Sequence, residues 1–221
     1  MGEAAKSPRP RIYVLAGVNG AGKSSVAGGM LAASGLAWFN PDSFARKLVA
    51  KGFDQDRANG FAWNYGKQKL EEAIAAKQNF AFETTLGGET LTSLLVTAAA
   101  THDIIMIFCG LANVEMHVER VKFRVSRGGH DIPSEKIQQR WTSSRENLIR
   151  LLPSLAWLQV FDNSKTVAAG EDVPSPTRVL EMQKGQILYP GLNDVTALAA
   201  TPNWAKPIVA AALKFGTQQN P

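Results

Sequence analysis

Short apolar runs alternate with longer amphipathic segments over most of the chain. Runs typical of buried strands are expected at 12–16, 36–39, 80–83, 103–110 and 158–161. Helical patterns fill the intervals between them. This alternation is typical of a parallel sheet covered by helices on both faces, so the sequence predicts an α/β fold.

Three helix patterns lie in these intervals. The segments 54–78 and 114–127 are helix-compatible, and two glycines that favour a helix end follow the second one. Pro133 and Ser134 open a third helix.

The pattern also predicts where the chain divides. Residues 1–10 are expected to be a flexible tail, and residues 11–165 to form the core. Prolines interrupt short elements in residues 166–221, which we interpret as a C-terminal extension.

The first apolar run is followed directly by the stretch GVNGAGKSS. Its spacing matches the phosphate-binding loop (P-loop), in which backbone N–H groups cradle nucleotide phosphates, a lysine reaches the β and γ phosphates and a serine hydroxyl binds Mg²⁺. We therefore predict ATP and Mg²⁺ as cofactors, with Ser24 as the metal ligand. The predicted nucleotide-binding residues are Gly17, Asn19, Gly20, Ala21, Gly22, Lys23, Ser24 and Ser25.

An acidic residue follows the second apolar run, in the stretch FNPDSFA. Ligands of open α/β sheets bind at the carboxyl ends of the strands, where Asp42 is expected. A kinase needs a carboxylate near the γ phosphate to accept the proton of the acceptor hydroxyl, and Asp42 is our candidate for this base. The alternative is structural, because Asn40 and Pro41 are typical helix-start residues and an acid is favourable in the first turn.

The third run ends in FETTLGG, with Glu83, Thr84 and Thr85. Beside Glu83, the hydroxyls of Thr84 and Thr85 are expected to face a polar, sugar-like substrate. The alternatives are a surface carboxylate for Glu83 and turn-forming roles for the threonines.

The segment 117–150 is predicted to be a lid. It has eight Lys or Arg against four Asp or Glu. Guanidinium groups suit a transferring phosphoryl group because they bond its oxygens in pairs. A solvated charged face is the alternative. Arginines on one predicted helix face are Arg120, Arg124 and Arg127, and the next helix carries Arg140 and Arg145.

Taken in order, the stretches GVNGAGKSS, NPDSFA, FETTL, RVSRGGHDIPSEKIQQRW and SSRENL resemble a zeta-toxin-type P-loop kinase over about residues 11–163. The resemblance implies transfer of the ATP γ phosphate to a hydroxyl of a UDP-activated amino sugar. It also implies that an antitoxin protein is a partner.

The resemblance assigns roles to individual residues. It implies phosphate binding by Lys23, general-base catalysis by Asp42, and a phosphate clamp formed by Arg127 and Arg140. Glu83 and Thr85 match substrate contacts, and Ser24 matches the magnesium ligand.

Two features depart from the family pattern. Gly87 stands where the family often has an arginine, which leaves the acceptor open. The strand expected at 103–110 carries no acid, so Mg²⁺ would rely on Ser24, water, the nucleotide and Asp42 or Glu83.

Composition and residue spacing argue against several classes of protein and of functional site. The 221 residues are 45% hydrophobic and 19% charged, with no apolar stretch long enough to span a bilayer, so we expect a cytoplasmic protein without a membrane partner. The three histidines do not have zinc-ligand spacing. The single cysteine, Cys109, lies in an apolar run and is expected to be a buried structural thiol. Although the net charge is +5, we see no aromatic and basic platform for nucleic acid.

Two alternatives remain open at this point. One is a housekeeping or resistance kinase that acts on another small molecule or a nucleotide. The other is an ATPase that drives a partner, although the sequence has neither a guanine-binding N-K-x-D motif nor an L-S-G-G-Q signature.

Overall fold

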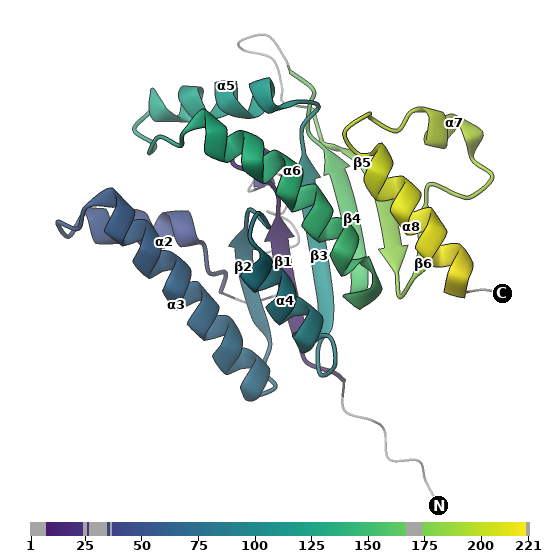
Figure 1. Ribbon diagram of the computed structural model, residues 1–221, viewed down its shortest axis with the longest axis horizontal. Coiled ribbons are helices and arrows are strands. Elements are labelled where there is room, and N and C mark those ends of the chain that lie inside the picture. Colours follow the sequence, from purple (N-terminus) through teal and green to yellow (C-terminus); the bar gives the residue numbers. More distant parts are fainter. Residues whose placement is uncertain (1–7, 24–25, 27–34, 36, 167–173, 220–221) are drawn as a thin grey trace, which may run out of the picture.

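A computed structural model describes residues 8–23, 26, 35, 37–166 and 174–219. It contains a six-stranded sheet in the order β2-β1-β3-β4-β5-β6 (Figure 1). The strands are β1 (Arg11–Ala16), β2 (Phe80–Thr84), β3 (Asp103–Gly110), β4 (Leu155–Asp162), β5 (Thr177–Gln183) and β6 (Gln186–Tyr189). The helices are α2 (Pro41–Val49), α3 (Gln55–Ala75), α4 (Glu89–Ala98), α5 (Val114–Val125), α6 (Ser134–Leu151), α7 (Val195–Ala199) and α8 (Lys206–Gln219), with a 3-10 turn η1 (Leu152–Ser154).

The predicted α/β fold is confirmed, but the sheet is mixed rather than wholly parallel. Strands β1 to β4 pair in parallel, whereas β5 and β6 are antiparallel to their neighbours. A two-residue turn at Lys184 and Gly185, both with positive φ, joins β5 directly to β6 and accounts for the antiparallel pairing of these two strands. Turns of this kind connect only antiparallel strands.

The expected strand at 36–39 is reduced to one contact. Phe39 forms an isolated parallel bridge with Phe82 beside β2, and Leu36 lies outside the described residues. This bridge directs the chain from the edge of the sheet into α2.

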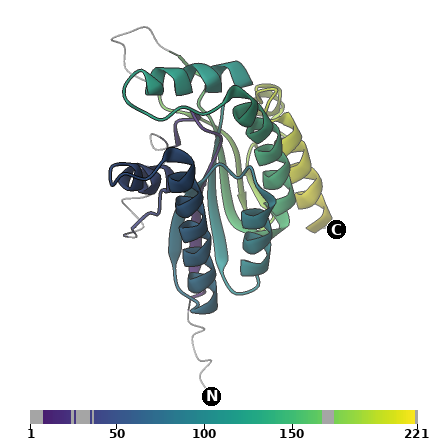
Figure 2. The same cartoon turned by 60° about the vertical axis from the view of Figure 1, so that its left-hand side comes forward.

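Strand β1 is buried on both faces, as expected for a central parallel strand. Ile12 and Val14 belong to the main core, whereas Leu15 packs with Cys109 on the opposite face. Helices α3, α4, α6 and α8 lie along one face of the sheet (Figures 1 and 2). Helix α5 crosses above the carboxyl ends of the parallel strands, so the space beneath it is where a ligand of this fold is expected.

The C-terminal segment is part of the same core. Trp204 is 3% exposed, packs against Phe108 and donates from Nε1 to Asp162 Oδ1 at 2.9 Å. Strands β5 and β6 and helix α8 thus extend the sheet beyond β4. Among the described helices, none combines the length and the apolar character that crossing a membrane requires.

Candidate active site

The loop after β1 is shaped by glycines that no other residue would replace without strain. Gly17 has φ +141°, and a Cβ built there would lie 2.3 Å from the Cys109 carbonyl oxygen. At Gly22, with φ +78°, a Cβ would lie 2.2 Å from Asn163 Nδ2. The side chain of Asn163 donates to the Ala21 carbonyl at 3.0 Å. The end of β4 therefore holds the loop in position from behind.

The other residues predicted to bind the nucleotide belong to this loop or follow it directly. Gly20 also has a positive φ, and its Cα faces the His117 carbonyl. Ser24 and Ser25 lie outside the described residues, so the predicted magnesium ligand has no described position.

The Lys23 side chain is buried and has two polar partners. Its ammonium donates to the Gly17 carbonyl at 2.8 Å and lies 3.3 Å from Glu83 Oε1, with 8% of the lysine side chain exposed. The other carboxylate oxygen of Glu83 accepts from Asn40 Nδ2 at 2.6 Å. The predicted phosphate-binding lysine and the predicted substrate contact are therefore direct neighbours.

Asp42 sits in the first turn of α2. Asn40 caps this helix by accepting from the Ser43 amide at 2.8 Å, and Pro41 is its first residue. The helix-start interpretation of this stretch is thus confirmed. The Asp42 carboxylate is 40% exposed, lies 3.7 Å from Arg124 and also lines a cavity, so a structural role and a chemical role are compatible.

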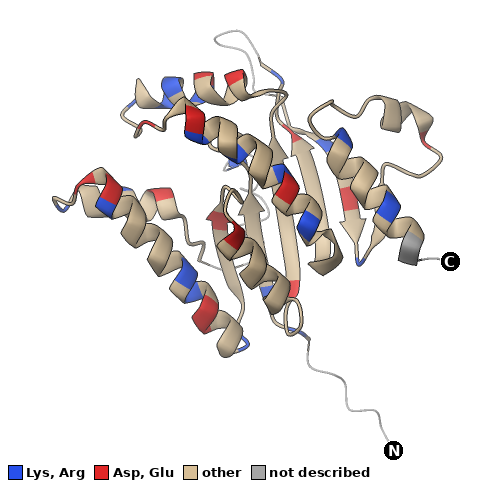
Figure 3. Ribbon diagram, in the orientation of Figure 1, with Lys and Arg blue, Asp and Glu red and all other residues tan. Residues whose placement is uncertain are grey.

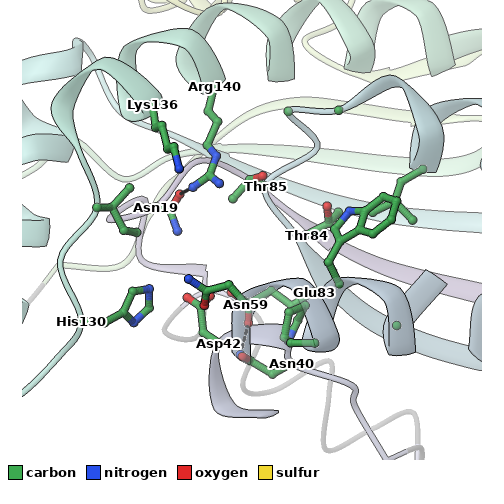
Figure 4. A pocket seen from close by; sticks show the side chains of 18 of the residues that line it. Asn19, Asn40, Asp42, Asn59, Glu83, Thr84, Thr85, His130, Lys136 and Arg140 are labelled. Atoms are coloured by element: carbon green, nitrogen blue, oxygen red, sulfur yellow. Dashed lines mark hydrogen bonds between the residues drawn. The ribbon is translucent and has the colours of Figure 1, made fainter. Parts of the chain in front are cut away.

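One cavity of about 600 Å³ connects these groups. The predicted site residues on its wall are Asn19, Lys23, Asp42, Glu83, Thr85 and Arg140. Several lining residues were not foreseen: Asn40, Asn59, Trp63, His130 and Lys136. Figure 4 shows Lys136 and Arg140 extending from one helix toward Asn19, with Asp42, Glu83 and Asn59 on the opposite side. The four-residue spacing of Lys136 and Arg140 could have revealed their common face.

Asn19 links the loop to both helices above it. Its side-chain oxygen accepts from Arg140 Nη1 at 2.7 Å, and its carbonyl accepts from His117 Nδ1 at 2.8 Å. Burial lowers the pKa of His117 to about 4, so the ring is neutral and its proton is on Nδ1, where the bond to Asn19 requires it. Burial also lowers the pKa of Arg140, against the opposite influence of Asp42.

The three arginines of α5 have different surroundings. Arg120 donates to the carbonyls of Asn163 and Lys165, and Arg124 reaches Asp42. Arg127 is exposed, stacks on the Phe123 ring at 4.4 Å and is not among the described residues of the cavity wall. The structure therefore brings Arg140 to the site but does not bring Arg127 there. Figure 3 shows acidic residues interspersed with the basic ones on α5 and α6.

Two carboxylates are available for a metal ion. The described residues contain no group of three or more His, Cys, Asp or Glu side chains that would hold one alone. Mg²⁺ is usually bound by one or two carboxylates together with substrate phosphates and water. Asp42 and Glu83 on one cavity wall fit this requirement.

Cys109 is buried beneath the loop, as predicted. Burial raises the pKa of its thiol to about 12, so it remains protonated and does not act as a nucleophile.

Known proteins share this fold. The chain resembles a crystal structure of AvrRxo1-ORF1:AvrRxo1-ORF2 with sulphate ions, with 17% identity and a TM-score of 0.63, over 89% of this chain and 64% of the other. It resembles another, of AvrRxo1-ORF1:-ORF2 with ATP, with 19% identity and a TM-score of 0.61, over 81% and 60%. The chain thus spans less than two thirds of either matched chain.

A weaker similarity is to a structure of the PezAT chromosomal toxin-antitoxin system of Streptococcus pneumoniae, with 13% identity and a TM-score of 0.49, over 78% of this chain and 76% of the other. No curated protein sequence matches the chain. The family model AAA_33, described as an AAA domain, matches residues 12–148, which is more than half of the chain. The chain therefore belongs to this family and has its P-loop kinase-like fold.

Proposed function

We propose that the protein is an ATP- and Mg²⁺-dependent kinase that transfers the γ phosphate to a hydroxyl of a small metabolite. The observation that carries this proposal is the common cavity of Lys23 and Asp42. A phosphate-binding cation and a carboxylate that line the same cavity are the two groups that transfer to a hydroxyl needs.

On the donor side, Lys23 binds the β and γ phosphates. Glu83 holds its ammonium at 3.3 Å, so the phosphates replace or share this partner when ATP binds. Arg140 lies above Asn19 of the same loop and stabilises the charge on the transferring group. Glu83 and Ser24 would hold Mg²⁺, which would add positive charge beside the phosphates when bound.

On the acceptor side, the Asp42 carboxylate takes the proton of the acceptor hydroxyl. The hydroxyl oxygen then forms a bond to the γ phosphorus while the bond from phosphorus to the β–γ bridging oxygen breaks, and ADP leaves. The proton passes from Asp42 to water, which is accessible because this side chain is 40% exposed.

For the acceptor, we propose a UDP-activated amino sugar, on the strength of the zeta-toxin-type motifs. Thr85 and Asn59 on the cavity wall supply polar groups of the kind that bind sugar hydroxyls. Gly87 favours a second candidate, a kinase for a different small molecule, because the family motif often has an arginine there. Toxicity and an antitoxin partner belong to the first candidate alone.

A substrate panel separates the two candidates. The purified protein is incubated with ATP, Mg²⁺ and UDP sugars, nucleosides, nucleotides or a cell extract, and the products are identified by mass spectrometry. A phosphorylated UDP amino sugar supports the first candidate. Phosphorylation of another metabolite supports the second, and ATP consumption without any phosphorylated product contradicts both.

Growth after induced expression gives an independent test of toxicity. Cells that express the wild type are expected to grow more slowly than cells that express Asp42→Asn at the same level. Equal growth of the two strains would contradict the toxin proposal and leave the metabolite kinase.

A further inference from the structure

Two consecutive glycines after β2 have opposite surroundings. A Cβ built at Gly87 would lie 2.9 Å from Arg140 Cγ and 3.5 Å from Arg140 Cβ. No described atom lies within 4 Å of a Cβ built at Gly88. Only the first glycine therefore has a packing reason to lack a side chain. The atom that a Cβ would approach most closely belongs to the stem of Arg140, whereas Thr85 Oγ1, at 3.5 Å, would be at ordinary contact distance.

The loop that contains Gly87 is held in place by hydrogen bonds from α6. Ser143 Oγ donates to the Gly87 carbonyl at 3.0 Å, and Asn147 Nδ2 donates to the Leu86 carbonyl at 2.9 Å. The Leu86 side chain is fully buried, and its amide donates to Thr84 Oγ1. A side chain added at position 87 would therefore displace Arg140 rather than the loop.

The position of the Arg140 stem determines where its guanidinium lies. Nη1 of this side chain donates to Asn19 Oδ1 at 2.7 Å, and Asn19 is itself 5% exposed and held by His117. Since the contact at Gly87 involves Cγ, near the base of the side chain, a shift there moves every atom beyond it. The bond to Asn19 would be lost or lengthened.

We propose that Gly87 is a positioning residue: its missing side chain lets Arg140 lie against the loop after β2 and reach Asn19, where the guanidinium faces the γ phosphate of ATP. The last part rests on the proposed function. Gly87 itself touches no reacting group. It acts on catalysis through Arg140, and the size of the residue at position 87 sets how far Arg140 extends over the P-loop.

The first test measures the position of Arg140 without any nucleotide. NMR spectra of the arginine Nε–H groups are recorded for the wild type and for Gly87→Ala, with the Arg140 signal identified by its loss in Arg140→Ala. The signal is expected to shift in Gly87→Ala and to remain in place in the matched control Gly88→Ala. An unchanged Arg140 signal in Gly87→Ala would overturn the inference.

The second test measures what the position does. Dissociation constants for ADP and a non-hydrolysable ATP analogue are determined for the same variants and for Gly87→Ala/Arg140→Ala. Gly87→Ala is expected to weaken the ATP analogue about tenfold, the scale of a charge-assisted hydrogen bond, with ADP nearly unchanged. In the Arg140→Ala background the glycine substitution should have no further effect, because the stem it displaces is gone.

The two tests distinguish two kinds of failure. Equal losses from Gly87→Ala in both backgrounds would mean that it acts through the loop, which overturns the inference. A shifted NMR signal together with an Arg140→Ala variant that binds ATP analogue and ADP as the wild type does would contradict the phosphate-facing role in the proposed function, while the placement of Arg140 by Gly87 would hold.

Discussion

The two walls of the cavity differ in how firmly their side chains are held. On the P-loop wall, Lys23 and Asn19 are 8% and 5% exposed and each has partners from other elements. On the wall formed by α2 and α3, Asp42 and Trp63 are 40% and 44% exposed. Under the proposed function, the P-loop wall is preorganised for phosphate, whereas the opposite wall leaves its polar and aromatic groups exposed to the acceptor.

The largest effect is expected when the lysine of the P-loop wall is removed. Lys23→Ala is expected to abolish phosphoryl transfer, because the site is built around this charge and the Glu83 carboxylate would be left without its cation. Turnover is measured with saturating ATP, and thermal melting of the same sample shows whether the variant is folded. A folded variant that turns over normally would contradict the assignment of the P-loop.

On the wall formed by α2 and α3, Asp42→Asn is expected to lower kcat by about 10², the usual scale for loss of a general base, while ATP affinity changes little. The substitution removes a proton acceptor but keeps the shape of the side chain. Turnover and nucleotide binding are measured on one preparation. If activity is retained and only about 0.3 to 1 kcal/mol of stability is lost, Asp42 is a helix-start acid and nothing more.

The arginines of the predicted lid sharpen the comparison further. Arg140→Lys is expected to lower kcat about tenfold with a smaller effect on ATP affinity, because lysine keeps the charge but loses the fork that bonds Asn19 and phosphate together. The matched variant Arg127→Lys changes an exposed residue stacked on Phe123 and should alter kcat by less than about twofold.

The opposite order, a large loss in Arg127→Lys and none in Arg140→Lys, would show that the sequence resemblance identifies the clamp better than this geometry does. Equal losses in both would support the pair of arginines that the resemblance implies.

The last prediction concerns stability rather than turnover, and its subject is His117. The folded protein holds its pKa near 4, below the ordinary value of 6.5, so the unfolded chain binds more protons between these pH values. The free energy of unfolding should therefore fall as the pH falls from about 6.5 to about 4, by up to about 3 kcal/mol from this residue. Denaturant unfolding of wild type and His117→Asn checks this, and identical pH slopes would contradict it.

How much of the site was predictable depends on whether a residue belongs to a local sequence motif. The glycines, Lys23, Asp42 and Glu83 could be located from the sequence because they belong to short motifs next to strand ends, where local spacing determines position. Asn59 and Trp63 face the cavity only because α3 packs beside β2, and no local pattern reports that contact.

The arginines show a second limit. Helical spacing places Arg120, Arg124 and Arg127 on one face of α5. They nevertheless lie at different heights along the helix, so each reaches a different partner. The antiparallel strands β5 and β6 were missed for another reason. Prolines suggested irregular structure there, whereas the Lys184–Gly185 turn forms a hairpin that completes the sheet.

The most direct test of the account follows the γ phosphate itself. Wild type and Lys23→Ala are incubated with Mg²⁺, a cell extract depleted of proteins and ATP labelled on its γ phosphate, and the labelled products are separated. The account predicts that label moves from ATP into a small organic product with wild type and does not move with Lys23→Ala. Label released by the wild type only as inorganic phosphate would contradict the kinase and indicate an ATPase.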